Sequence, residues 1–142
     1  MFYKEMVNIR LFILLVFFLV CLITGCTLTA QDVIDEFKVP ENSDHKLNIV
    51  VLIESSDSVY AVNKQLVAIL DRFRGIVQSY PMRSMQDQEV REKAKVLGIN
   101  TFPTYLLLDR KGIVIQTDDV NEFVKKVEQT AVSQILGERK GE

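Results

Sequence analysis

The feature that most constrains this chain is an unbroken apolar run near its amino terminus, from Leu11 to Ile23. Lys4 and Arg10 precede the run, and small or polar residues follow it. A membrane-spanning helix needs about 20 apolar residues, and this run is shorter. Positive charge, a short apolar stretch and then small residues are typical of a secretory signal. We therefore assign residues 1–25 to a signal peptide outside the folded domain.

The signal ends in a short motif, Leu22-Ile23-Thr24-Gly25-Cys26. This motif resembles the lipobox of bacterial lipoproteins, in which aliphatic and small residues precede an invariant cysteine. The resemblance implies cleavage between Gly25 and Cys26 and attachment of a diacylglyceryl group to the Cys26 thiol. Two acyl chains, such as palmitate, suffice for stable anchoring. We expect Cys26 to hold the protein at the extracytoplasmic face of the cell membrane; the alternative is an uncleaved signal anchor.

Charge and cysteine content exclude two classes of function. Without Lys4, Arg10 and Glu5, the chain beyond the signal keeps 15 basic and 18 acidic residues. No basic excess is available to release counterions from phosphates, so we expect no nucleic-acid partner. The two cysteines are Cys21, inside the signal, and Cys26, which lipidation would convert to a thioether. The mature chain would then lack the thiolate that disulfide exchange requires.

Residues 26–45 are polar and mixed, and residues 40–44 form a turn or linker signal. Val33, Ile34 and Phe37 have helical spacing, but a helix of about eight residues is marginal by itself. We expect residues 26–45 to be the lipidated amino terminus and a tether containing at most one short element. Residues 46–142 would form the folded domain.

Strand and helix patterns alternate along this domain. In chain order, we expect a strand at 47–53, a helix at about 59–73, a strand at about 76–82, a helix after Asp87, strands at 105–109 and 113–116, and a helix at about 119–136. Pro81 lacks an amide donor and places the second strand at an edge. The order β-α-β-α-β-β-α predicts an α/β domain with a mixed four-stranded sheet flanked by helices.

Residues 97–112, Leu-Gly-Ile-Asn-Thr-Phe-Pro-Thr-Tyr-Leu-Leu-Leu-Asp-Arg-Lys-Gly, resemble a stretch of the thioredoxin family. They carry its G-[IV]-x-x-x-P-T pattern, an apolar strand and a D-x-x-G turn. The ending is most similar to the membrane-tethered extracytoplasmic branch, which includes thiol–disulfide oxidoreductases of cytochrome c maturation. The resemblance covers about residues 46–136 and implies a thioredoxin-like fold. It also implies a cis bond before Pro103 and backbone pairing of Phe102 with a substrate strand.

The family's Cys-x-x-Cys motif should stand between the first strand and the first helix. This sequence has Glu-Ser-Ser-Asp-Ser-Val-Tyr at 54–60 instead, so the resemblance does not carry oxidoreductase activity to it. We expect a binding module rather than an enzyme, with no metal and no cofactor. The candidate binding groove is the former active-site face: Ser56, Asp57, Tyr60, Phe102 and Pro103.

The expected partners are the membrane, through Cys26, and an envelope protein or an extended peptide; peptidoglycan is a further candidate. One alternative is a thioredoxin-like oxidoreductase, or its accessory subunit, that acts through a partner's cysteines. Another is a membrane-anchored protein of purely structural use.

Two other groups of residues contain side chains that could carry chemistry. Ser55, Ser56 and Asp57 with His45 contain the residue types of a hydrolase triad, but serine and aspartate before a helix are common caps. Glu41, Asp44 and His45 offer metal-binding side chains without the spacing of a zinc or calcium site. We interpret the first set as helix caps with a histidine in the preceding linker, and the second as a solvated linker.

Overall fold

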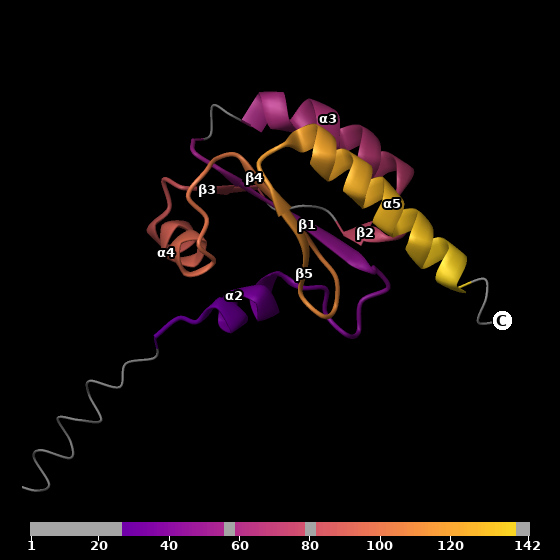
Figure 1. Cartoon of the computed structure of the whole chain (residues 1–142), viewed down its shortest axis with the longest axis horizontal. Helices are drawn as coiled ribbons and strands as arrows, with labels where there is room; N and C mark the ends of the chain where they lie inside the picture. Colours follow the sequence, from indigo (N-terminus) through magenta and orange to yellow (C-terminus); the bar gives the residue numbers. More distant parts are fainter. Residues whose placement is uncertain (1–26, 56–58, 79–81, 139–142) are drawn as a thin grey trace, which may run out of the picture.

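The computed structural model describes residues 27–55, 59–78 and 82–138, and its elements follow the predicted order with one additional helix at the start (Figure 1). The elements are α2 (Ala30–Phe37), β1 (Leu47–Ile53), α3 (Val59–Arg72), β2 (Val77–Gln78), β3 (Met82–Ser84), α4 (Gln88–Val96), β4 (Thr104–Leu108), β5 (Ile113–Thr117) and α5 (Val120–Glu138). The prediction of an α/β domain with a mixed sheet is confirmed, but the sheet has five strands rather than the four expected.

The sheet has the order β2-β1-β4-β5, and β3 also pairs with β1. β2 and β3 run parallel to β1, whereas β4 is antiparallel to both β1 and β5. Where the sequence predicted one edge strand at about 76–82, the described residues form two short strands, β2 and β3, along the same side of β1, and residues 79–81 lie outside the described part of the chain. Every residue of β1 is buried, because helices cover both faces of the sheet and the strand has no solvent side.

Two helices cover each face of the sheet. Figure 1 shows α3 and α5 on one face and α2 with α4 on the other. Since side chains alternate along a strand, Ile49 and Val51 of β1 enter the core under α3 and α5, whereas Val50 and Leu52 enter the core on the α2 and α4 side. The helices thus close two separate apolar layers around one central strand.

The expectation of a tether over 26–45 is wrong for the segment that forms α2. Val33 and Phe37 of this helix and Val39 just after it are buried in the core that α4 also covers. An eight-residue helix is marginal alone, but burial of its apolar side against the sheet stabilises it. The folded unit therefore includes α2 and begins at its cap, Thr29, rather than at residue 46.

The predicted D-x-x-G turn joins β4 to β5. Asp109 Oδ1 accepts hydrogen bonds from the backbone N–H groups of Lys111, at 2.7 Å, and Gly112, at 3.0 Å. Gly112 has a φ of 143°, a conformation that side chains rarely adopt. None of the helices in the described part of the chain has the length and apolar content to span a bilayer.

Candidate functional site

The Phe102–Pro103 peptide bond is cis, as the resemblance implied. It lies in the loop that enters β4, whose first residue, Thr104, pairs with Leu52 near the end of β1. Glu54 and Ser55 follow β1 directly, so the antiparallel pairing places them at the same end of the sheet as Phe102 and Pro103. Two of the five predicted groove residues therefore lie beside the start of the β1–α3 connection.

Local contacts hold the loop that carries this bond. Thr104 Oγ1 donates a hydrogen bond of 2.6 Å to the carbonyl oxygen of Thr101. Gly98, with a φ of 70°, lies just after the end of α4, and Ile99 is buried. Phe102 packs against the α2 and α4 core but is only partly buried, and Pro103 is also partly exposed. Phe102 thus packs against the core and also contributes surface.

The other three predicted groove residues are not placed. Ser56 and Asp57 lie outside the described residues, and of Tyr60 only its position in the first turns of α3 is described. The groove formed by all five residues stays a prediction. At its described margin, Glu54 is exposed and Ser55 is partly buried.

Tyr105 and Asp119 lie close to the same end of the sheet. Tyr105 is 3% exposed and stacks on Phe123 of α5, with 5.3 Å between ring centroids. Burial raises the pKa of the Tyr105 phenol, and the charge of Asp119 raises it further. Asp119 Oδ1 also accepts a hydrogen bond of 2.8 Å from the N–H of Asn121, so it caps α5. Asp119 thus caps α5, and Tyr105 packs on the first turn of that helix through Phe123.

The structure separates His45 and Ser55, the two residues of the hydrolase hypothesis that it describes. His45 precedes β1 and Ser55 follows it, so the strand holds them roughly 20 Å apart, at about 3.3 Å per residue. His45 lines a different cavity, of about 500 Å³, together with Leu70 and Arg74. Within the described ranges, no cluster of three or more histidine, cysteine or acidic side chains could hold a metal ion.

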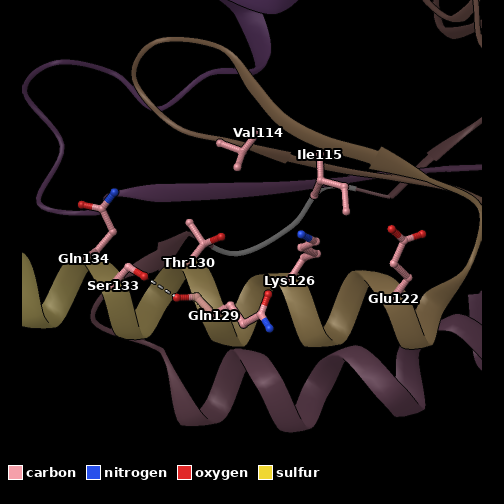
Figure 2. A pocket seen from close by; sticks show the side chains of 8 residues that line it. All are labelled: Val114, Ile115, Glu122, Lys126, Gln129, Thr130, Ser133 and Gln134. Carbon is pink, nitrogen blue, oxygen red and sulfur yellow. Dashed lines mark hydrogen bonds between the residues drawn. The ribbon is translucent and has the colours of Figure 1, made fainter.

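A further cavity, of about 440 Å³, lies between the edge strand β5 and helix α5, and no sequence pattern predicted it. Figure 2 shows Val114 and Ile115 of β5 opposite polar side chains of α5, among them Lys126 and Gln129. Ile115 and Ile113 pair with Leu107 and Leu108, which leaves Val114 as the extra residue of a bulge.

Sequence reasoning also missed two polar side chains that fix α2. Asn48 of β1 is buried and donates from Nδ2 to the carbonyl oxygen of Phe37 over 2.6 Å. Lys93 of α4 is 8% exposed and binds the carboxylates of Glu36 and Glu89. Burial lowers the pKa of Lys93, but the hydrogen bonds to Glu36 and Glu89 outweigh it, so the pKa is raised overall. The only sequence signal was one polar residue within the apolar run 47–53.

Neither a protein-family model nor a curated protein sequence matches the chain. Solved structures do resemble it. Thioredoxin f2 of Chlamydomonas reinhardtii superposes with a TM-score of 0.52 at 14% identity, over 72% of this chain and 93% of that one. Fasciola hepatica thioredoxin gives 0.50 at 14% identity, over 72% and 95% of the two chains. Thioredoxin f from spinach chloroplast gives 0.50 at 14% identity, over 73% and 83%. The domain therefore has a thioredoxin-like fold.

Proposed function

We propose that the protein is a cell-envelope lipoprotein whose thioredoxin-like domain binds a partner and is itself redox-inactive. The anchor would be the diacylglyceryl group on Cys26, placed by the lipobox that ends the signal peptide. The proposed ligand is an extended segment of an envelope protein, with peptidoglycan as a second candidate.

One observation carries the claim of redox inactivity. The fold is thioredoxin-like, yet residues 27–142 contain no cysteine, and the connection from β1 to α3 reads Glu-Ser-Ser-Asp-Ser at 54–58. Thiol–disulfide exchange needs a thiolate to attack the disulfide. Hydroxyl and carboxylate groups cannot replace it. The domain alone would therefore leave a disulfide substrate unchanged.

The surface around Phe102 and Pro103 is the proposed binding face. An extended peptide can add to an exposed backbone through main-chain hydrogen bonds while neighbouring pockets take its side chains. The resemblance to the thioredoxin family assigns this backbone role to the residue before the proline, here Phe102. Its partly exposed ring would add an apolar contact, and Ser56, Asp57 and Tyr60 would complete the face.

Site-specific photo-crosslinking in intact cells tests this binding face. A photoreactive phenylalanine analogue replaces Phe102 in one variant and Val67, an exposed residue of α3, in the control. We expect a discrete adduct from position 102 alone, and blocking thiols beforehand should leave it intact. The same adducts from both positions, or none from position 102, would contradict the proposal. Loss of the adduct after thiol blocking would favour the oxidoreductase-accessory alternative.

A disulfide-reduction assay tests redox inactivity separately. The full chain is added to insulin and dithiothreitol, with a thioredoxin as the positive control. We expect the rate of insulin precipitation to equal the rate with dithiothreitol alone. An acceleration by this chain would refute redox inactivity.

A further inference from the structure

Helix α2 is docked at both its apolar and its polar side. Val33 and Phe37 are buried in the core, and Asn48 holds the carbonyl oxygen of Phe37 at 2.6 Å. Lys93 Nζ lies 2.6 Å from Glu36 Oε1 and 5.8 Å from the centroid of the Phe37 ring. These contacts join α2 to β1 and α4, so α2 belongs to the rigid part of the domain.

The chain enters this rigid part at the start of α2, where local hydrogen bonds hold the backbone. Thr29 caps α2: its hydroxyl accepts from the N–H of Asp32 at 3.2 Å, and Asp32 Oδ2 accepts from the N–H of Thr29 at 2.9 Å. The side-chain and backbone hydrogen bonds from Thr29 lower the pKa of Asp32, so this capping box holds at neutral pH. In Figure 1 the start of α2, in indigo, lies on the opposite side of the molecule from the end of α5.

We infer that the amino-terminal end of α2, with Leu28, docks on the lipid bilayer. The inference rests on the proposed lipidation of Cys26. Three Cα–Cα steps separate Cys26 from Thr29, and at about 3.8 Å each they span at most about 11 Å. A tether over 26–45 would let the domain move away from the membrane. A tether of three steps holds the start of α2 against the bilayer surface.

The exposure of Leu28 also supports the start of α2 as the part of the domain that contacts the membrane. Leu28 is a large apolar residue that is 40% exposed, and it lies two residues after the predicted anchor. An apolar side chain next to a lipidated residue lowers its free energy by entering the interface between headgroups and acyl chains. Asp32 and Asp35 lie exposed on the first turns of α2, so this end favours a neutral headgroup surface over an anionic one.

The short tether limits where a partner can be. A domain of about 110 residues is roughly 35 Å across. Every part of it would then lie within roughly 45 Å of the anchor, since the tether adds only about 11 Å. A membrane-bound envelope protein can present a peptide inside that range. This geometry favours such a protein over a polymer that lies farther from the membrane.

Energy transfer to membrane dyes tests the docking. Gln31→Cys on α2 and Val67→Cys on α3 are both at exposed positions, and residues 27–142 offer no competing thiol. The lipidated variants are labelled with a donor and reconstituted into phosphatidylcholine vesicles that contain an acceptor lipid. We expect greater transfer from position 31 than from position 67. Inserting twelve glycine and serine residues after Thr27 should remove the difference, because a flexible linker of that length spans about 20 Å.

The outcomes distinguish a failure of the membrane docking from a failure of the lipid anchor. Equal transfer from the two positions without the inserted linker would overturn the docking, while vesicle flotation and the intact mass would still report lipidation. A full-length unmodified mass would overturn lipidation and the docking with it. For the role of Leu28, we expect Leu28→Ser to reduce the difference and the matched control Thr27→Ser to preserve it. An unchanged difference in Leu28→Ser would refute insertion of Leu28.

Discussion

Lys93 Nζ lies 2.6 Å from Glu36 Oε1, across 57 residues of sequence. The lysine comes from α4 and the glutamate from α2, and Glu89 of α4 binds the same ammonium group. Lys93 is buried, whereas the two carboxylates keep contact with solvent. This ion pair therefore joins the amino-terminal helix to the domain at a point where only the cation is desolvated.

Replacing Lys93 with methionine should lower the free energy of unfolding by about 1–2 kcal/mol, because two charge-assisted hydrogen bonds are lost while the apolar stem is kept. The matched control is Lys95→Met, at an exposed position of the same helix. Urea denaturation followed by circular dichroism measures both. Equal stabilities of the two variants would show that the ion pair contributes nothing.

The ion pair of Lys93 also predicts that its contribution to the free energy of unfolding depends on pH. The pKa of Lys93 in the folded protein is raised above the ordinary value of 10.5. At a pH below the pKa of Lys93 in the unfolded state, the raised pKa stabilises the folded state fully. As the pH rises through the pKa in the folded state, this stabilisation disappears. The stability difference between wild type and Lys93→Met should thus be constant at neutral pH and shrink above about pH 10.5. A difference that stays constant at alkaline pH would contradict this assignment.

Asn48→Asp should destabilise the protein by about 2–4 kcal/mol at neutral pH, because a buried carboxylate would face the Phe37 carbonyl oxygen without a donor. At acidic pH the protonated acid could donate to that carbonyl, so part of the loss should be recovered. Unfolding curves at several pH values, compared with Asn48→Ala, measure this. A loss that is equal at every pH would show that the carbonyl contact is not the cause.

Gly112→Ala should cost about 1–3 kcal/mol, since a φ of 143° is strained for any residue with a side chain. The added methyl group would also lie 3.4 Å from Ile34 Cγ2 of α2. Gly75→Ala is the control, because its φ is not positive and no atom lies within 4 Å of the added carbon. Thermal unfolding of both variants checks the prediction. A loss of equal size at Gly75 would mean that the backbone conformation is not responsible.

Local patterns predicted most of the fold. The run 47–53 became β1 with the expected bounds, because continuous apolar sequence is what a strand covered on both faces requires. Asp109 and Gly112 predicted the hairpin, because aspartate and glycine are residue types that tight turns favour. The second strand was predicted as one segment, and its two pieces reflect pairing with different parts of β1.

The docking of α2 could not be predicted from local pattern. Its capping box and amphipathic spacing are visible in the sequence, yet eight residues form a stable helix only through tertiary contacts. Those contacts come from Asn48 and Lys93, which no short-range pattern connects to Glu36 and Phe37. For the candidate site, the family motif located Phe102 and Pro103, because motif and loop are contiguous. Ser56, Asp57 and Tyr60 remain predictions.

The intact mass of the protein extracted from membranes tests the central claim most directly. We expect a chain that begins at residue 26 and carries a diacylglyceryl group, and we expect the Cys26→Ser variant to lack that added mass. This result would leave the mature domain without a free thiol and support a lipid-anchored binding module. An unmodified full-length mass would contradict the account, since Cys21 and Cys26 would then remain as thiols in an uncleaved anchor.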